Sequence, residues 1–392
     1  MNYVFFLFLT KYYLFKMNRI QMVDLKGQYL KIKNEVNDSI AEVIESSAFI
    51  NGPKVKQFQQ NLENYLSVKH VIPCGNGTDA LQIALMALGL KPGDEVITAN
   101  FTFIATVEVV ALLGLKLKLV DVDPETFNLN VKQVEESVSP DTKAIVPVHV
   151  FGQGANMEEI LRIAEKNNLF VIEDTAQAIG ADYMFDNGTK KKLGTIGTVG
   201  CTSFFPSKNL GCYGDGGALY TNDDKLAGKI RQIANHGSKV KYFHDEIGVN
   251  SRLDSIQAAI LNVKLNYLDD YIAARQKAAD FYDSAFKNHP NIIIPIRDKK
   301  TTHVFHQYTI KVKNIDRDGL KEFLNENDIP AMIYYPYPLH LQNAYKYLGY
   351  KENDFPVTEE LSKVVLSLPM HTELSEDQLK YITEKVLEYA GK

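Results

Sequence analysis

Short apolar runs alternate with helical patterns between about residues 71 and 217. Runs of four or five residues are typical of buried strands, and the stretches between them carry apolar residues at helical spacing. An alternation of strands and helices implies βαβ units and a largely parallel sheet. The clearest predicted strands are residues 95–98, 118–121, 144–148 and 169–172.

Two of the intervening helices are well defined by their pattern. In the first, residues 79–88, the side chains of Leu81, Leu85 and Leu88 lie on one face, and residues 157–166 repeat the arrangement. In parallel α/β sheets, ligands bind beyond the carboxyl ends of the strands. Residues that directly follow the predicted strands are therefore the main candidates for a functional site.

The pattern changes near residue 265, where a long charged helix begins and a smaller α+β domain is predicted. We expect no flexible linker, because the sequence contains no internal repeat or low-complexity tract. The predicted elements of this part are helices 265–288, 318–327 and 375–389 and a strand at 307–310. The predicted division of the chain is an extension at 1–16, a large cofactor-binding domain at 17–264 and a small domain at 265–392.

The first 16 residues do not fit the rest of the chain. Their apolar run, residues 4–9, is interrupted by Lys11 and is shorter than the roughly 20 residues of a spanning helix. A basic start and a small-residue cleavage site, which mark a secretory signal, are both missing. We interpret the segment as an extension without function, with the working chain beginning near Met17 or Met22. The alternative is a weak membrane-surface anchor.

Composition narrows the class of protein. Hydrophobic residues make up 45% and charged residues 23% of the 392 residues, which excludes disordered, collagen-like and simple coiled-coil chains. The net charge of −5 argues against a nucleic-acid-binding protein. Three cysteines, Cys74, Cys201 and Cys212, are too few for a disulfide framework and lack zinc-ligand spacing. We expect them to be buried small hydrophobes in a reducing cytoplasm, and we expect no metal site.

A glycine-rich segment, residues 74–79, follows a predicted strand and opens a helix. Its two glycines permit a tight turn, and a helix N-terminus offers free N–H groups and partial positive charge to a phosphate. The alternative is an ordinary helix start with Thr78 or Asp79 as the N-cap.

A carboxylate, Asp174, lies two residues after the predicted strand at 169–172. Asp174 lies at the predicted ligand edge, where it can pair with a cationic ring nitrogen and keep that nitrogen protonated. Alternatively, Asp174 caps the next helix. We expect the neighbouring Glu173 to point to the opposite face of the sheet.

A lysine stands between an aromatic stretch, residues 202–207, and a glycine-rich stretch, residues 211–217. Apolar surroundings lower the pKa of an amine, which suits Lys208 to Schiff-base chemistry. Ser203 can donate a hydrogen bond to a phosphate. The alternative for Lys208 is a solvated lysine in a surface loop.

A polar loop, residues 248–254, runs into an alanine-rich helix. Its Arg252 is either a clamp for a substrate anion or the ion-pair partner of Asp254.

These segments, in this order and spacing, resemble the DegT/DnrJ/EryC1/StrS family of sugar aminotransferases, which depend on pyridoxal 5'-phosphate. The resemblance extends from about Met22 to the C-terminus and includes residues 91–97 and 148–153. It implies the α/β type I aminotransferase fold, with a large, mostly parallel α/β domain and a smaller α+β domain. It also implies a cytoplasmic homodimer with shared active sites.

The resemblance implies a role for each matching residue. Lys208 would form the Schiff base with the cofactor and shuttle a proton, and Asp174 would pair with the ring nitrogen. The other implied cofactor contacts are the helix start at Gly77, Thr78 and Asp79, Phe103 stacked on the ring, Gln177 at the ring hydroxyl, Ser203 at the phosphate, and Asn250 reaching the phosphate from the partner subunit. The implied substrate contacts are Arg252, Tyr334, Tyr335 and His340.

Within the family, the chain is most similar to 3-aminotransferases of bacterial surface-polysaccharide (O-antigen) synthesis. These use glutamate to aminate UDP-2-acetamido-2-deoxy-3-oxo-glucuronate. The motifs separate them poorly from enzymes of dTDP-3-oxo-6-deoxyhexoses, and Tyr334 stands where the uronate enzymes carry histidine. A non-catalytic regulatory protein of the same fold is disfavoured because Lys208 and Asp174 are intact. A same-fold enzyme with another acceptor, such as an inosose or an aminobenzoate precursor, stays open.

Overall fold

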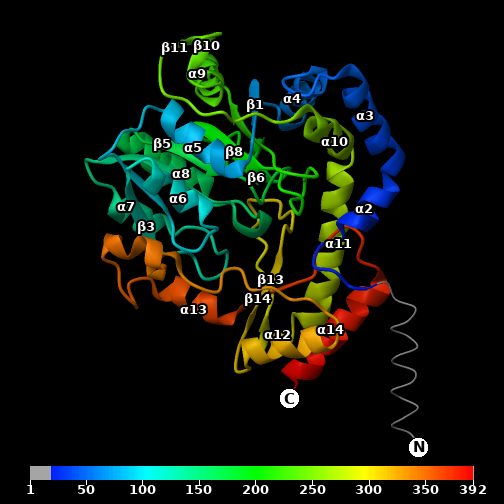
Figure 1. The fold of residues 1–392 in the computed structure, drawn as a ribbon. Coiled ribbons are helices and arrows are strands. Elements are labelled where there is room, and N and C mark those ends of the chain that lie inside the picture. The colour runs from blue at the N-terminus through cyan, green and yellow to red at the C-terminus, as the bar shows by residue number, and fades with distance from the viewer. Residues whose placement is uncertain (1–18, 392) are drawn as a thin grey trace, which may run out of the picture.

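A seven-stranded sheet forms the centre of the molecule in the computed structural model, which describes residues 19–391 (Figure 1). The strand order is β1-β9-β8-β5-β4-β2-β3. Neighbouring strands from β8 to β3 are parallel, and β9 is antiparallel to both β8 and β1. The strands are β1 (His70–Cys74), β2 (Glu95–Ala99), β3 (Lys116–Val120), β4 (Thr142–Val146), β5 (Phe170–Asp174), β8 (Val199–Ser203) and β9 (Gly217–Thr221).

The four predicted strands are confirmed as β2, β3, β4 and β5, and the predicted parallel sheet is confirmed in its central part. Hydrophobic clusters cover both faces of this sheet, which explains why its strands are continuous apolar runs. Helices α5 (Gly77–Ala87), α6 (Ala105–Leu112) and α9 (Asp224–Ala234) contribute to one cluster. Helices α4 (Pro53–Leu66), α7 (Val131–Ser137), α8 (Met157–Asn167) and α10 (Ser255–Leu265) contribute to the other.

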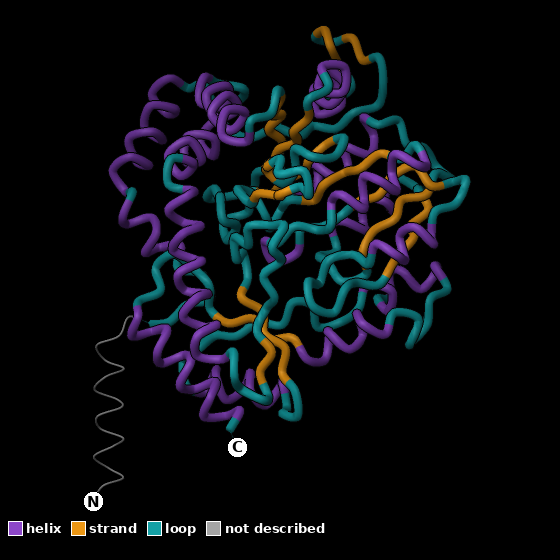
Figure 2. Tube along the Cα trace, turned by 180° about the vertical axis from the view of Figure 1, so that it is seen from behind, coloured by secondary structure: helices purple, strands orange, loops and turns teal. Residues whose placement is uncertain are grey.

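A smaller antiparallel sheet packs with helices in the C-terminal part of the chain (Figure 2). Its strands are β12 (Ile292–Ile293), β13 (Tyr308–Val312) and β14 (Val365–Leu368), and its helices are α11 (Leu268–Phe286), α12 (Arg317–Glu326), α13 (Pro356–Val364) and α14 (Glu376–Ala390). The last helix begins as predicted at Ser375, where Ser375 and Gln378 form a reciprocal capping box. The helix predicted from residue 265 is partly wrong, because α10 ends at Leu265 and a new helix begins at Leu268.

A hairpin projects from the α/β part beside α9 (Figure 1). It consists of β10 (Ser238–Val240) and β11 (Phe243–His244). Helices α2 (Leu25–Lys31) and α3 (Lys33–Ser46) lie on the outside of the molecule, and a second hairpin is formed by β6 (Asp182–Met184) and β7 (Lys190–Lys192). Short 3-10 turns complete the elements, at Val150–Gly152, Leu339–Leu341 and Asn343–Leu348.

The predicted extension at 1–16 lies outside the described residues. Over residues 19–391, no helix is long and apolar enough to cross a membrane. The proposed domain boundary at residues 264 and 265 stays a prediction. All three cysteines are buried free thiols, as expected.

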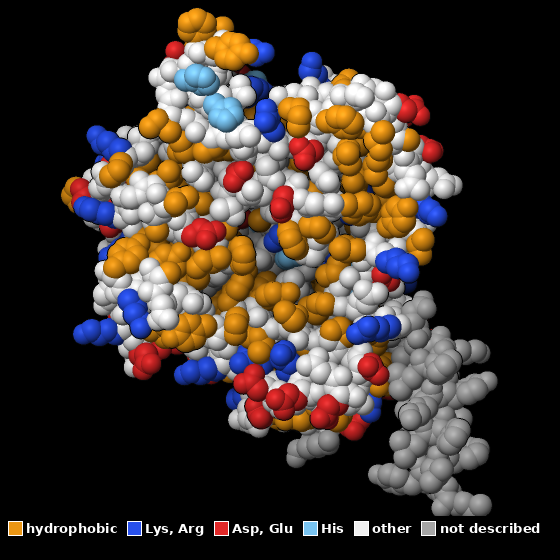
Figure 3. Space-filling model, in the orientation of Figure 1, with side chains coloured by type: hydrophobic (Ala, Val, Ile, Leu, Met, Phe, Trp, Pro, Cys, Tyr) orange, Lys and Arg blue, Asp and Glu red, His pale blue; other side chains and the backbone are white. Residues whose placement is uncertain are grey.

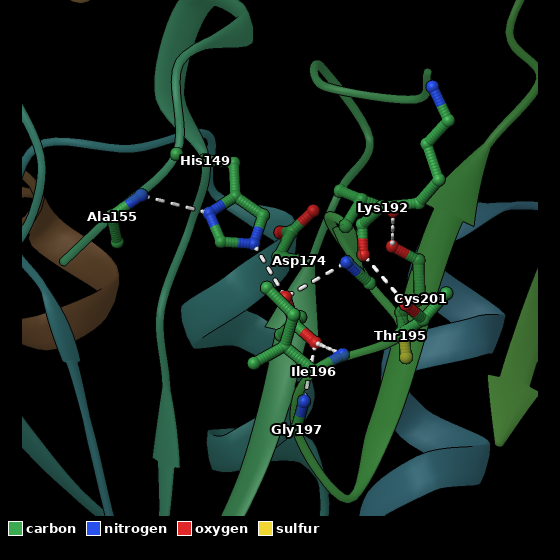
Figure 4. A network of polar contacts seen from close by, with 12 residues as sticks. His149, Ala155, Asp174, Lys192, Thr195, Ile196, Gly197 and Cys201 are labelled. Carbon is green, nitrogen blue, oxygen red and sulfur yellow. Dashed lines mark hydrogen bonds and ion pairs between the residues drawn. The ribbon is translucent and has the colours of Figure 1, made fainter. Parts of the chain in front are cut away.

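A buried polar network holds the end of β5 in place (Figure 4). The Glu173 carboxylate accepts hydrogen bonds from the backbone amides of Gly194, Ile196 and Gly197 at 2.6–2.8 Å. The Nε2 of His149 lies 3.0 Å from the same carboxylate, and its Nδ1 accepts from the amide of Ala155, which assigns the proton to Nε2. Glu173 therefore points away from Asp174, whose carboxylate bonds Thr106 on the other face, as strand alternation requires.

Replacing Glu173 should destabilise the protein strongly. In Glu173→Gln, an amide NH₂ replaces one acceptor oxygen and faces donors that have lost their partner. We expect a loss of about 3 kcal/mol in the free energy of unfolding, measured in urea. The control is Glu165→Gln at an exposed position of α8, which should change stability by less than about 0.5 kcal/mol. Equal stability of the two variants would contradict a structural role for the network.

Candidate active site

The carboxyl ends of three strands meet at one edge of the large sheet. Gly217, the first residue of β9, pairs with Cys74 at the end of β1 and with Ser203 at the end of β8. Asp174 ends β5, the parallel neighbour of β8. The predicted phosphate segment, the predicted carboxylate and the segment before Lys208 are therefore brought together, as the βαβ topology requires.

The start of α5 is suited to an anion. The Oδ1 of Asn76 accepts a hydrogen bond from the amide of Asp79 at 2.8 Å, so the N-cap is Asn76, and the suggested caps Thr78 and Asp79 are wrong. This cap leaves the amides of Gly77 and Thr78, which have no intrahelical acceptor, available to a ligand. A Cβ atom at Gly77 would lie 2.7 Å from the Cβ of Ser203, so only glycine allows the serine hydroxyl so close to the helix start.

Asp79 faces a different partner. Its carboxylate accepts a hydrogen bond of 2.6 Å from the hydroxyl of Ser251, and that hydroxyl accepts from the amide of Gly75 at 2.9 Å. Asp79 therefore fixes the loop of Asn250 and Arg252 beside the helix start. A direct contact between Asp79 and a cofactor stays a prediction.

Asp174 is buried at the centre of this edge, with a side chain only 6% exposed. Thr106 donates a hydrogen bond to its Oδ2 at 2.9 Å, and the amide of Ala176 donates to its Oδ1 at 3.1 Å. The carboxylate thus holds a turn, and no helix follows that it could cap. Burial raises the pKa of Asp174 above its usual value, and its hydrogen bonds and the nearby Lys208 only partly oppose this shift. A cationic group bound beside Asp174 would therefore stabilise the charged carboxylate.

Lys208 lies in the turn after β8, next to the fully buried Phe204 and Leu210. Desolvation by burial lowers the pKa of its amine to about 8, and the carboxylate of Asp174 opposes this shift. The half-buried amine has no hydrogen-bond partner within residues 19–391. A solvated surface lysine is therefore the wrong description. At neutral pH a larger fraction of this amine is uncharged than in an ordinary lysine, and that fraction grows as the pH rises through 8.

Gln177 and the aromatic residues line the same region. Oε1 of Gln177 accepts from the amide of Phe151 at 2.6 Å, and its Nε2 donates to the hydroxyl of Tyr335 at 3.0 Å. Tyr334 packs edge-on against Tyr335. Phe103 is 56% exposed, so it is not a core aromatic and offers a free ring.

Two polar residues of the 248–254 loop are open to a ligand. Asn250 is exposed and Arg252 is half-buried. Within the described part of the chain, the guanidinium of Arg252 has no ion-pair or hydrogen-bond partner, and none of the ion pairs joins it to Asp254. The geometry therefore favours the anion clamp over the structural ion pair for Arg252.

His340 is placed differently from its prediction. The residue is 1% exposed, its Nδ1 lies 2.7 Å from the side-chain Nδ2 of Asn100, and its Nε2 lies 3.3 Å from Glu359. Its ring also packs against Phe355. A residue enclosed in this way offers almost no surface to a sugar, so the geometry does not support a direct contact between His340 and a substrate.

The structure adds residues that the sequence motifs did not indicate. Thr106 and His149 both bond the end of β5. Thr106 lies in no matching segment, and His149 lies in the matching segment 148–153, which predicted no role for it. His306 is 5% exposed, and burial, together with the charge of Lys208, lowers the pKa of its imidazole. Figure 3 shows a hollow in this face of the molecule, with basic and histidine side chains at its floor.

Comparison with known proteins identifies relatives over nearly the whole chain. The family described as "DegT/DnrJ/EryC1/StrS aminotransferase family" matches residues 30–387. A "Pleiotropic regulatory protein" of Geobacillus stearothermophilus is 50% identical, covering 94% of this chain and 98% of its own length. A "UDP-2-acetamido-2-deoxy-3-oxo-D-glucuronate aminotransferase" of Pseudomonas aeruginosa is 45% identical, covering 93% and 98%. A "dTDP-3-amino-3,4,6-trideoxy-alpha-D-glucose transaminase" of Streptomyces venezuelae is 36% identical, covering 95% and 96%.

Solved structures show the same fold. A "DegT DnrJ EryC1 StrS aminotransferase from Brucella abortus" superposes with a TM-score of 0.89 at 44% identity, covering 95% of this chain and all of that one. The NtdA structure from Bacillus subtilis, described as having "bound cofactor pmp", superposes with a TM-score of 0.85 at 33% identity, covering 92% and 82%.

The close approach at Gly77 yields a test of the anion seat. In Gly77→Ala, the new methyl group must displace Ser203, so we expect the dissociation constant for pyridoxal phosphate to rise at least about tenfold, or about 1.4 kcal/mol. The control is Gly228→Ala in α9, where a Cβ atom meets nothing within 4 Å. Equilibrium dialysis of the two variants measures the difference, and equal affinities would rule out a phosphate at this helix start.

Proposed function

The chain belongs to the DegT/DnrJ/EryC1/StrS aminotransferase family, and from this we propose that it aminates a nucleotide-linked 3-keto sugar with L-glutamate as the donor. Its fold is the type I aminotransferase fold, and its activity is that of a sugar aminotransferase that uses pyridoxal phosphate. The acceptor that we propose is UDP-2-acetamido-2-deoxy-3-oxo-glucuronate, in a cytoplasmic step of surface-polysaccharide (O-antigen) synthesis.

One observation carries the proposal: the Lys208 amine, with a pKa of about 8, interacts electrostatically with the buried Asp174 carboxylate, at the sheet edge where the capped start of α5 leaves two backbone amides free. These are the three groups that a pyridoxal phosphate site requires. When bound, the cofactor supplies a ring that withdraws electrons from the donor carbon.

The residues present fit the cofactor. Gly77, Thr78 and Ser203 would hold the phosphate with two amides and a hydroxyl, and Asp174 would hold the ring nitrogen in its protonated form. Phe103 would stack on the ring with its exposed face, and Gln177 lies where it can meet the ring hydroxyl. The contacts of these residues with the cofactor are part of the proposal.

Lys208 would carry the proton in the reaction. Its neutral amine would take a proton from the donor carbon onto Nζ and deliver it from the same atom to the cofactor side of the site, which requires an amine whose pKa lies near the working pH. Burial provides this pKa, since an ordinary lysine would be protonated at pH 7. Thr106 and the Ala176 amide keep Asp174 oriented throughout.

Arg252 supports a carboxylate-bearing acceptor. Its planar guanidinium is unpartnered and matches a carboxylate in two parallel hydrogen bonds. The Pseudomonas aeruginosa relative is named for a hexuronate substrate, which would supply this carboxylate. The alternative acceptor is a dTDP-linked 3-oxo-6-deoxyhexose, in line with the Streptomyces venezuelae relative.

We further propose that two copies of the chain share their active sites. The β10–β11 hairpin and the loop after it carry exposed apolar side chains that water would not favour in a monomer, and Figure 3 shows such side chains over the tip of this projection. These side chains are Val240, Tyr242, Phe243 and Ile247. The exposed Asn250 follows closely in the chain, so a hairpin docked on a second copy would bring Asn250 towards the partner's phosphate seat.

A panel of keto sugars tests the reaction and the acceptor. With glutamate as donor, we expect formation of 2-oxoglutarate and of the aminated sugar, with kcat/KM at least about tenfold higher for the UDP-linked uronate than for dTDP-linked sugars. Lys208→Ala should lose about four orders of magnitude in activity. Arg252→Leu should slow amination of the sugar about a hundredfold and leave conversion of the cofactor by glutamate unchanged, because the clamp serves the acceptor.

Each alternative has its own result in this panel. Faster turnover of dTDP-linked sugars would replace the proposed acceptor. A slow glutamate step in Arg252→Leu would move the clamp to the donor carboxylate. Normal conversion by glutamate with no active sugar would favour a regulatory role, like the name of the Geobacillus stearothermophilus relative.

Mixing two inactive variants tests the shared site. If Lys208 and Asn250 act on the same cofactor from different subunits, a mixed dimer of Lys208→Ala and Asn250→Ala keeps one intact site. Random exchange of subunits should then restore about a quarter of the wild-type activity. The control is a mixture of Lys208→Ala and Asp174→Ala chains. Because each site takes both residues from one subunit, this mixture should restore none of the wild-type activity. Equal results for the two mixtures would contradict the shared site.

A further inference from the structure

Residues 332–340, which we call the crossing segment, run from the small sheet to the large one. At the start of the segment, the backbone of Met332 pairs with Ser367 of β14 in both directions, at 2.7 and 3.1 Å. At its end, the backbone amide of His340 donates to the side-chain Oδ1 of Asn100 at 3.0 Å, and Asn100 directly follows β2. Each end of the segment is therefore fixed to a different sheet.

The middle of the crossing segment contacts the candidate active site. The hydroxyl of Tyr335 accepts a hydrogen bond from the Nε2 of Gln177 at 3.0 Å. The ring of Tyr335 also packs edge-on against Phe101, with 5.7 Å between the ring centroids. The neighbouring Tyr334 is half-buried, and its hydroxyl has no hydrogen-bond partner within residues 19–391. The segment thus carries a hydroxyl group that is available to a ligand, next to a residue that bonds the site.

Asn100 forms two side-chain bonds to one residue, His340, and the first bond fixes the geometry of the second. Because a backbone amide can only donate, the Oδ1 of Asn100 faces that amide and its Nδ2 faces the imidazole ring, 2.7 Å from Nδ1. Nδ1 is therefore the acceptor, and the ring proton lies on Nε2, 3.3 Å from Glu359. Burial lowers the pKa of His340, with Glu359 and Asp354 as the charged groups that oppose this shift, so the ring is neutral at neutral pH. Both bonded residues are only 1% exposed, which excludes water as a competitor.

The next strand along the sheet holds the chain that follows the crossing segment. Asp121 comes directly after β3 and accepts hydrogen bonds from the amides of Val357 and Thr358 at 2.9 and 2.8 Å, and from the hydroxyl of Thr358 at 2.7 Å. These bonds anchor the start of α13 independently of Asn100. Loss of the Asn100 side chain should therefore release the end of the crossing segment and leave α13 attached to the sheet.

We propose that Asn100 is a positioning residue for the acceptor step: through its two hydrogen bonds to His340 it fixes the crossing segment, and with it Tyr334 and Tyr335, at the carboxyl edge of β2. A nucleotide-linked sugar extends much further from its reacting carbon than glutamate does, so the segment would touch the sugar and not the donor. This inference rests on the proposed function and adds the residue that holds one wall of the acceptor site in place.

Four variants separate this role from a general loss of stability. Asn100→Leu removes both bonds at a similar side-chain volume, and His340→Leu removes only the bond to the ring. His340→Asn returns an acceptor, because its amide oxygen is as many bonds from Cβ as the Nδ1 of histidine is. The matched control is Asn262→Leu in α10, since Asn262 is also buried and donates to the carbonyls of Lys54 and Ala258 at 2.9 Å, away from the crossing segment.

Amide hydrogen exchange in the cofactor-free, full-length chain measures how firmly the segment is held. Exchange is followed by mass spectrometry in the peptide of residues 339–345, whose short turns are hydrogen-bonded next to Asn100. We expect these amides to exchange at least about tenfold faster in Asn100→Leu and at the wild-type rate in Asn262→Leu. His340→Leu should show part of the increase, and His340→Asn should return close to the wild-type rate. Equal exchange in Asn100→Leu and the wild type would overturn the proposal.

The second measurement compares the glutamate step and the sugar step of the cofactor-loaded enzyme. We expect Asn100→Leu to lower kcat/KM for the sugar about ten- to a hundredfold and to leave the glutamate step within about twofold of the wild type. Equal slowing of both steps would overturn the proposal, because a general loss of structure gives that result. An Asn262→Leu enzyme with the same sugar defect would overturn it as well.

Two further comparisons keep the test decisive. If Asn100→Leu does not fold, His340→Leu and His340→Asn supply the same contrast, and equal behaviour of these two variants would overturn the role of the hydrogen bond. If the wild-type enzyme aminates no sugar of the panel, the proposed function fails. The exchange measurement needs neither cofactor nor sugar, so it still confirms or overturns the hold of Asn100 on the crossing segment.

Discussion

A half-buried amine and a buried carboxylate that interact electrostatically are the constraint around which this protein is arranged. Burial penalises the charges of both Lys208 and Asp174, and the attraction between the two groups offsets this penalty only in part. The penalty keeps Lys208 reactive near neutral pH, and it leaves Asp174 in need of a cation. Because of its desolvation penalty, such a pair contributes little to the stability of the fold, and its role lies in binding and catalysis.

The surrounding structure compensates for this cost with rigid support. On one face of the sheet, Thr106 holds the carboxylate of Asp174, and on the other Glu173 gathers three backbone amides and His149. His149 also donates its backbone amide to the carbonyl of Asp174 at 3.0 Å. The end of β5 is thus tied on both sides, so the acid cannot rotate away from the site when its charge state changes.

Much of this arrangement was predictable from the sequence, because it follows from local pattern and from topology. The apolar runs predict β2 to β5, and the rule that sites lie beyond parallel strands selects Asp174 and Lys208. The N-cap was mispredicted because Asn76, Thr78 and Asp79 are all good capping residues, and only the backbone geometry distinguishes them. The burial of His340 and the position of His306 depend on contacts between segments more than 90 residues apart, such as Asn209 with Val304, which no local pattern encodes.

The three buried cysteines lie at the catalytic edge and share one chemical property. Cys74 ends the strand before the anion seat, Cys201 pairs in register with Asp174, and Cys212 lies in the glycine-rich loop after Lys208. All three are enclosed, and desolvation raises the pKa of each, so the native protein holds almost no thiolate for oxidants or alkylating agents to attack. The thiols would become exposed when the catalytic edge loosens, so their reactivity would report the opening of that edge.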